Sequence, residues 1–212
     1  MIHHSIKQAQ QSKLIRRVIV STDSDRYRQV AMDAGAEAPF LRPAEMAADL
    51  SPDVPAFQHA LAWLKEHEGY TPDIVVHLRP TCPVRSVKDI DTAIEILINR
   101  THVDSVRSVS AAVQNPYRMW TRVNQTGMLI PIAIPPPNEV YTSYSIGEAG
   151  NSPRQLMPEV WMQNCCIEVV RASVILNENS MTGKRVYGLI TPKQHDIDTE
   201  EDFEAAMKAL DA

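Results

Sequence analysis

The sequence predicts an α/β domain with three layers, in which helices cover both faces of a mainly parallel sheet. Short β-branched apolar runs alternate along the chain with segments whose apolar residues recur at helical spacing. The apolar runs are continuous rather than alternating, as in strands that are covered on both faces. Such an order of strands and helices favours parallel pairing through right-handed crossovers, and therefore a three-layer arrangement.

The first elements show this alternation clearly. Apolar residues at helical spacing over 2–14 predict a helix, and the run at 18–20 predicts a buried strand. Capping residues at 21–24 open a second helix, which is expected to stop at Gly35. A short strand is expected at 38–41.

The third helix has a recognisable start. Ser51 is expected to be its cap and Pro52 its first helical residue, and the helix should end before Gly69. The later elements follow in chain order: a strand at 74–78, a helix from Ser86, strands at 105–109 and 166–170, a helix near 172–176, a strand at 186–190 and a last helix from Thr199 with Asp202 in a capping-box arrangement.

The alternation breaks between 114 and 163. This stretch is too rich in proline for a helix and too aromatic for disorder. It is interpreted as a protruding β-rich arm or subunit contact within one domain that spans 1–212.

Composition and charge exclude several classes of protein. The net charge of −5 argues against a protein that binds a nucleic-acid backbone. Cys82, Cys165 and Cys166 form neither a disulfide framework nor a zinc-binding spacing. No apolar run approaches the ~20 residues of a membrane span, and the start does not resemble a signal peptide. The simplest expectation is a reduced, cytoplasmic protein that binds neither nucleic acid nor a membrane.

The strand that ends near Leu78 leads into a candidate ligand loop, Arg79–Arg85. In parallel sheets ligands bind at the carboxyl ends of the strands. Thr81 and the backbone N–H groups could meet a nucleotide, and Arg79 or Arg85 could neutralise an anion. The alternative is a rigid connection, stiffened by two prolines, whose arginines are solvated.

Asp196-Ile197-Asp198 is the sharpest local pattern. In an extended segment both carboxylates would face one side, where they could hold Mg²⁺. The alternative is that both are ordinary acidic residues before a helix, where they favour the helix dipole.

The other reactive side chains give weaker signals. Cys82 could be a nucleophile, but a buried thiol is the commoner role. The histidines, including His77 and His195, match no zinc pattern and are interpreted as structural or exposed.

Four segments together resemble the cytidylyltransferases that make CMP-sialic acid and related CMP-nonulosonic acids. They are Arg17–Asp23, Phe40–Met46, Arg79–Arg85 with Asp89–Asp91, and Asp196–Phe203; Pro153–Pro158 followed by Gln163 and Asn164 adds a fifth match. The resemblance implies a nucleotidyltransferase of Rossmann-like fold with a dimerisation arm, acting on CTP and a sialic-type acid with Mg²⁺.

The resemblance also implies roles for individual residues. Arg42 matches an arginine that addresses cytosine, and the loop with Thr81, Cys82 and Arg85 matches one that lines the base and ribose. Positions on the sugar side are matched by Arg154, Gln155 and Asn164. Asp196 and Asp198 match the catalytic carboxylates that hold Mg²⁺.

Several positions depart from the family pattern. Arg79 stands where the family usually has Gln, Cys82 stands where it has Ser, and Cys165 stands where it commonly has Gly. The family's opening strand and its loop rich in glycine and lysine, which hold the triphosphate, are not found before the first helix.

Because electrostatic stabilisation is often the largest catalytic effect, little turnover is expected from these 212 residues. Two alternatives stay open: a non-catalytic family remnant that acts through dimerisation, and a nucleotidyltransferase for another sugar.

Overall fold

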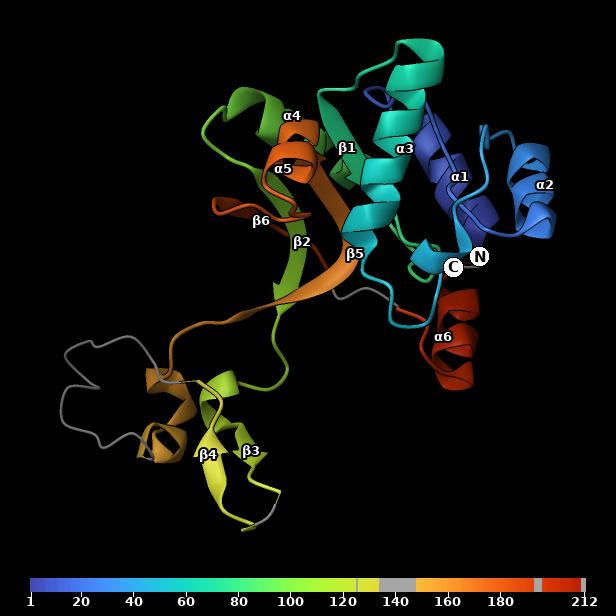
Figure 1. Ribbon diagram of the computed structural model, residues 1–212. Coiled ribbons are helices and arrows are strands. Elements are labelled where there is room, and N and C mark those ends of the chain that lie inside the picture. The colour runs from blue at the N-terminus through green and yellow to red at the C-terminus, as the bar shows by residue number, and fades with distance from the viewer. Residues whose placement is uncertain (125, 134–147, 193–195, 211–212) are drawn as a thin grey trace. The chain divides into compact units, whose positions relative to one another are not determined.

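The computed structural model describes residues 1–124, 126–133, 148–192 and 196–210 (Figure 1). The chain divides into two compact units. The first combines Met1–Val109 with Gln163–Ala212, and the second is Ser110–Met162. The second unit covers most of the stretch in which an arm is expected. Its protrusion and its role in dimerisation stay predictions.

The first unit is built on a four-stranded sheet with the strand order β1-β5-β2-β6 (Figure 1). β2 and β6 are parallel, whereas β1 and β5 are antiparallel, so the sheet is mixed. The strands are β1 (Ile74–His77), β2 (Ser105–Ala111), β5 (Trp161–Arg171) and β6 (Val186–Ile190). The helices are α1 (Ile2–Gln11), α2 (Asp25–Asp33), α3 (Asp53–Glu68), α4 (Val87–Asn99), α5 (Ala172–Asn177) and α6 (Glu200–Leu210), with a 3-10 turn at Ala44–Met46.

Alternate residues of β1 and β5 enter two different cores, which produces the three layers. Val76 and Val169 pack with α4 in one core. Their neighbours Val75 and Val170 point to the other face and pack with α3 and α5. Because strand side chains alternate between faces, this division places helices on both sides of the sheet. The predicted α/β/α class is confirmed.

Two expected strands in the first part of the chain are wrong. The segments at 18–20 and 38–41 form no strand, and an isolated parallel bridge between Ile19 and Glu37 stands in their place. Val20 N–H donates to Glu37 O over 2.8 Å, and Glu37 N–H donates to Val18 O over 2.8 Å. The bridge is a single residue pair long, which is too short for a strand.

The predicted start of α3 is also wrong. Pro52 rather than Ser51 is the cap residue, and within the described part of the chain no side chain caps this helix. The Ser51 hydroxyl donates instead to Glu45 O over 3.1 Å. In contrast, α6 has the expected capping box: Thr199 N–H donates to the Asp202 carboxylate over 2.9 Å, and Asp202 N–H donates to the Thr199 hydroxyl over 3.3 Å.

The second unit contains a two-stranded antiparallel sheet of β3 (Trp120–Arg122) and β4 (Leu129–Pro131). Short 3-10 turns accompany it at Pro116–Arg118, Glu148–Asn151 and Arg154–Leu156. Asn115 ties its backbone together, because its amide donates to Pro158 O over 3.2 Å. In and next to the hairpin the apolar residues Trp120, Met128, Leu129, Ile130 and Ile132 are exposed.

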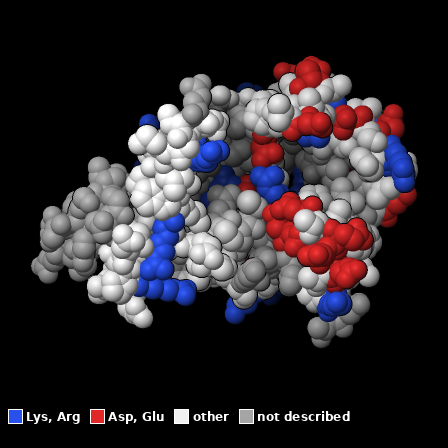
Figure 2. Space-filling view, turned by 90° about the horizontal axis from the view of Figure 1, so that it is seen from below, with Lys and Arg blue, Asp and Glu red and all other residues white. Residues whose placement is uncertain are grey.

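Acidic residues gather at the start of α6, where Glu200, Glu201 and Asp202 fill the first turn. Figure 2, which is seen from below the view of Figure 1, shows a cluster of acidic side chains. Such a surface repels a nucleic-acid backbone. Within the described residues, every helix is too short or too polar to cross a membrane.

Candidate active site

The loop after β1 is fixed by hydrogen bonds at both of its ends. Cys82 N–H donates to Arg79 O over 3.2 Å, which closes a tight turn. The Arg85 guanidinium donates to the same carbonyl over 2.5 Å and to the Ser5 hydroxyl of α1 over 3.1 Å. Arg85 is buried, so in this structure its guanidinium holds the loop in place through these hydrogen bonds. Its predicted contact with a nucleotide stays a prediction.

Asn164 of β5 joins this loop to β2 and to the residue that follows β6. Its carbonyl oxygen lies 3.6 Å from the Cys82 thiol. Its side-chain oxygen accepts from the Ser108 hydroxyl of β2 over 2.6 Å, and its amide donates to the Thr191 hydroxyl after β6 over 2.9 Å. A buried amide with such partners is held in one orientation. Asn164 therefore holds together the end of the sheet at which the parallel strands finish, where ligands are expected.

Asp196 reaches the same edge from the C-terminal part of the chain. The N–H of the next residue, Ile197, donates to Thr81 O over 2.9 Å. One Asp196 carboxylate oxygen, Oδ1, is buried and has no hydrogen-bond partner among the described residues. A buried carboxylate oxygen without a partner is costly, and a bound cation would satisfy it. Asp198 is exposed, and its N–H donates to Asp202 over 3.3 Å.

The three thiols lie beside Asp196, whose charge acts on each of them. A hydrogen bond with Cys166 and then burial raise the pKa of Cys82 far above its usual range, so Cys82 is a neutral thiol. The same hydrogen bond, helped by Arg85 against the effect of burial, lowers the pKa of Cys166 below its usual range. Cys82 is fully buried, which fits a packing role better than that of a nucleophile.

Cys165 adopts a backbone conformation that side chains disfavour. Its φ angle is 55°, in the left-handed region that glycine occupies without strain. The sequence resemblance places glycine at this position. The half-buried thiol therefore stands where the backbone geometry suits a glycine, next to Asn164.

Arg42, Arg154 and Gln155 are placed differently. Arg42 lies in the loop after Phe40, where its N–H donates to Thr22 O over 2.8 Å. Its guanidinium Nε is buried and has no hydrogen-bond partner among the described residues. No hydrogen bond or ion pair of the described residues links Arg42 to the Thr81–Arg85 loop. Arg154 and Gln155 belong to the second unit, on an exposed 3-10 turn. The first unit thus brings together Thr81, Cys82, Arg85, Asn164 and Asp196 from the predicted set.

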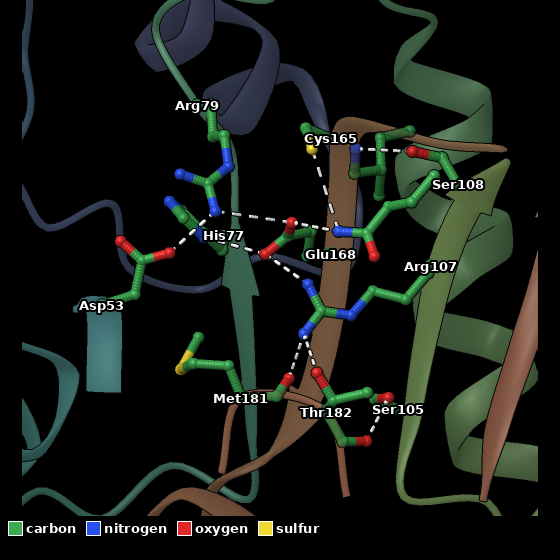
Figure 3. A network of polar contacts seen from close by, with 12 residues as sticks. Asp53, His77, Arg79, Ser105, Arg107, Ser108, Cys165, Glu168, Met181 and Thr182 are labelled. Atoms are coloured by element: carbon green, nitrogen blue, oxygen red, sulfur yellow. Dashed lines mark hydrogen bonds and ion pairs between the residues drawn. The ribbon is translucent and has the colours of Figure 1, made fainter. Parts of the chain in front are cut away.

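A buried network of charges lies next to these residues and was not predicted from the sequence (Figure 3). At its centre Glu168 of β5, with only 2% of its side chain exposed, forms an ion pair with Arg107 of β2. The His77 ring of β1 lies 3.0 Å from the same carboxylate, and the Gln163 amide donates to it over 3.0 Å. Arg107 is held in turn by Met181 O and, over 2.9 Å, by the Thr182 hydroxyl.

The network keeps Glu168 ionised. Burial alone would raise the pKa of Glu168, but the hydrogen bond with His77 and the charge of Arg107 outweigh it and lower the pKa to about 2. Arg79 extends the network to the surface: its guanidinium lies 3.6 Å from Glu168 and 2.7 Å from Asp53 of α3. A sequence signal for this network existed, since His77, Arg107 and Glu168 are polar residues inside predicted buried strands, where polar groups need partners.

No group of three or more His, Cys, Asp or Glu side chains suited to a metal ion occurs among the described residues. His195 and the two residues before it lie outside them. A Mg²⁺ ion commonly takes only one or two carboxylates from the protein, with water and substrate phosphates as further ligands. The Asp196 carboxylate, with its unpartnered oxygen, fits that pattern.

The fold and this strand edge define a class of protein, the three-layer α/β proteins that bind ligands where the strands end. A family model described as Cytidylyltransferase matches residues 1–208. The chain therefore belongs to the cytidylyltransferase family, and it is a nucleotidyltransferase by that membership.

Known proteins that resemble the chain agree with this family. It is 31% identical to CMP-N,N'-diacetyllegionaminic acid synthase of Campylobacter jejuni over 96% of this chain and 80% of that protein. It is 29% identical to post-translational flagellin modification protein B of Campylobacter coli, with the same coverage. The N-acylneuraminate cytidylyltransferase of Escherichia coli is 27% identical over 98% of this chain but only 45% of the relative.

Solved structures support the fold. A CMP:2-keto-3-deoxy-manno-octonic acid synthetase in complex with CTP aligns with a TM-score of 0.63 and 16% identity, over 100% of this chain and 88% of that one. The 4-diphosphocytidyl-2C-methyl-D-erythritol synthase of Anaerococcus prevotii aligns with a TM-score of 0.60 and 10% identity, over 100% and 86%.

Proposed function

We propose that this chain transfers CMP from CTP to a nonulosonic, sialic-type acid and releases pyrophosphate. Family membership supports nucleotidyl transfer, and the relatives named as CMP-legionaminic acid synthase and N-acylneuraminate cytidylyltransferase support the acceptor. The observation that carries the proposal is the convergence of the Thr81 loop, Asn164 and Asp196 at one strand edge. Each of these was matched to this chemistry from the sequence.

In the proposed site the nucleotide lies against the loop Thr81–Arg85, with Arg42 addressing the cytosine. Backbone groups and Thr81 make the contacts, since the Cys82 thiol is buried. On the sugar side Asn164 orients the acid so that its anomeric hydroxyl can approach the α-phosphorus of CTP. The sugar-binding roles of Arg154 and Gln155, which belong to the second unit, stay predictions from the sequence. Catalysis by such a site depends on positioning and on neutralising charge.

Asp196 and Asp198 would hold Mg²⁺ in this proposal. The unpartnered buried oxygen of Asp196 is the structural support for it, and the exposed carboxylate of Asp198 lies two residues away. When bound, the ion would supply positive charge to the phosphate oxygens. The role of the protein's own residues is to present two carboxylates beside the loop that meets the nucleotide.

We also propose that the chain is a homodimer through its second unit. The apolar residues of the β3–β4 hairpin that are exposed in the single chain, such as Trp120, Leu129 and Ile130, support this proposal. A second copy would bury such a patch. An Ile130→Asp variant should then lower the mass measured by light scattering from that of a dimer to that of a monomer, whereas an unchanged mass would contradict the proposal.

The function is tested by pyrophosphate release from CTP with N-acetylneuraminic or legionaminic acid, with and without Mg²⁺, alongside calorimetric titration with CTP. The proposal predicts Mg²⁺-dependent release, in place of the little turnover expected from the sequence alone, because the Thr81 loop, Asn164 and Asp196 converge where the strands end. Asp196→Asn and Asp198→Asn should each abolish this release. Glu201→Gln on α6 is the matched control and should retain the rate. The absence of both CTP binding and pyrophosphate release would contradict the proposal; a dimer that binds no CTP would favour a non-catalytic family member.

A further inference from the structure

Arg79 binds two carboxylates, and the two differ in how firmly they are held. Its Nη2 atom lies 2.7 Å from Asp53 and 3.6 Å from Glu168. The Glu168 side chain is 2% exposed, and Arg107, His77 and Gln163 also hold it. The Asp53 side chain is 44% exposed. Among the described residues, Arg79 is its one ion-pair or hydrogen-bond partner. The Asp53 carboxylate can therefore separate from Arg79, whereas the Glu168 carboxylate stays bound.

The Arg79 guanidinium has unused binding capacity. Its Nε atom is buried and has no hydrogen-bond partner among the described residues. A guanidinium presents a flat set of donors that matches a carboxylate through two parallel hydrogen bonds. The present contact with Asp53 uses Nη2 and leaves Nε unsatisfied. An unsatisfied buried donor costs free energy, and a carboxylate that bound both Nη2 and Nε would remove this cost.

Arg79 also stands in the right part of the molecule for a substrate contact. Its carbonyl accepts from Cys82 N–H and from Arg85, so the residue is the first one of the predicted nucleotide loop. Its charge acts on the thiol of Cys165, the neighbour of Asn164 on the predicted sugar side. Figure 3 shows Arg79 between Asp53 and the Glu168 network.

We propose that Arg79 is the receptor for the carboxylate of the sugar acid, and that Asp53 occupies this position until the acid binds. The inference rests on the function proposed above and names a residue that selects the acceptor. Glu168 keeps its contact with the Arg79 guanidinium throughout. The carboxylate of the acid replaces the carboxylate of Asp53 on that guanidinium. Exposed ion pairs are weak, so this exchange costs at most about fivefold in affinity.

The experiment is a calorimetric titration of the full chain with N-acetylneuraminic acid and with N,N'-diacetyllegionaminic acid, with CTP present and no divalent cation. Arg79→Gln should weaken binding of the acid by at least ~10-fold, because a hydrogen-bonded charge is lost. Arg79→Lys should also weaken it, since lysine lacks the planar pair of donors. Asp53→Asn should tighten it about two- to fivefold, because the competing carboxylate is removed.

The opposite signs separate this role from a structural one. If the Arg79–Asp53 pair only stabilised the fold, both variants would lower the melting temperature and change acid binding in the same direction. The methyl ester of the acid is the matched ligand: it should bind weakly to the original protein and show no difference between the variants.

Several results would overturn the inference. An unchanged affinity for the acid in Arg79→Gln would overturn it, and so would a weaker affinity in Asp53→Asn or no binding of the acid by the original protein. A loss of CTP affinity in Arg79→Gln, in place of a loss of acid affinity, would also overturn it and would make the triphosphate the ligand of Arg79. The proposed function fails separately, through the absence of CTP binding and pyrophosphate release in the original protein. If that protein turns over CTP with the acid while both variants behave like it, only this inference is wrong.

Discussion

Glu168 and Arg107 form an ion pair inside the first unit, with only 2% and 6% of their side chains exposed. Neither charge can regain water if its partner is removed. Breaking a buried pair by removing one member therefore costs more than the pair itself contributes. This relationship between two neighbouring strands has consequences for stability that can be measured separately from activity.

Glu168→Gln should lower the free energy of unfolding by about 3–5 kcal/mol, because it leaves Arg107 charged and uncompensated. Urea unfolding followed by circular dichroism measures this value. The double variant Glu168→Leu with Arg107→Met should lose much less, since both charges are then absent. Glu201→Gln, on the exposed first turn of α6, is the control and should change stability little. A Glu168→Gln variant as stable as the original protein would show that the pair is dispensable.

Stability should also depend on pH through Glu168. Its pKa in the folded state, about 2, lies below the usual 4.5, so folding favours its ionised form. The contribution, about 3 kcal/mol, is fully present above pH 4.5 and is lost as the pH falls toward 2. Unfolding free energies measured across this range should fall with pH, and Glu168→Gln should remove part of the slope.

A second carboxyl group shares this acid range and has to be separated from Glu168. The hydrogen bond from Arg185 is the main cause that lowers the pKa of Asp104, against the effect of burial. Asp104→Asn should remove that group's share of the slope and leave the share of Glu168 intact. If Glu168→Gln leaves the whole slope unchanged, the carboxylate is not ionised by its neighbours as described.

Much of the fold could be predicted because its signals are local. The strand at 186–190 was placed correctly, and the helix near 172–176 and the capping box of α6 were found from nearby residues. The strands at 18–20 and 38–41 were wrong because a strand also needs a partner along its length. Here the partnership is one bridge between Ile19 and Glu37, a relationship that neither segment reveals alone.

The candidate site was predictable in part. The order of the strands brought the loop at 79–85 to the strand edge, and the resemblance added Asn164 and Asp196. The partners of Glu168 could not be identified, because the sheet register decides which residues meet: His77 lies opposite Glu168 only in the antiparallel pairing of β1 with β5. A polar residue in a buried strand signals that a partner exists but does not name it.

Two glycines with similar φ angles should respond differently to alanine. Gly69, which ends α3, has φ 63° and open space where a methyl group would be added, whereas Gly183 has φ 72° and would place that methyl 2.5 Å from Asp104 Cβ. Gly69→Ala should cost about 1 kcal/mol of unfolding free energy, from the left-handed conformation alone. Gly183→Ala should cost a further ~1–3 kcal/mol from crowding. Equal losses in thermal or urea unfolding would contradict the close approach.

Cys165→Gly should stabilise the protein, although it removes a half-buried side chain. The left-handed conformation at φ 55° costs a residue with a side chain about 1–2 kcal/mol, and glycine returns roughly half of that gain through its more flexible unfolded state. The expected net gain in unfolding free energy is about 0.5–1 kcal/mol. Cys165→Ala is the matched control: it removes the thiol but keeps Cβ, and should bring no gain.

Asn179→Gly tests the same conformation at φ 52°. Asparagine is tolerated there, and its side chain accepts from Gln58 over 3.0 Å, so this variant should bring no gain either. A gain in Cys165→Ala as large as in Cys165→Gly would show that the thiol, and not the backbone, is the source of the strain.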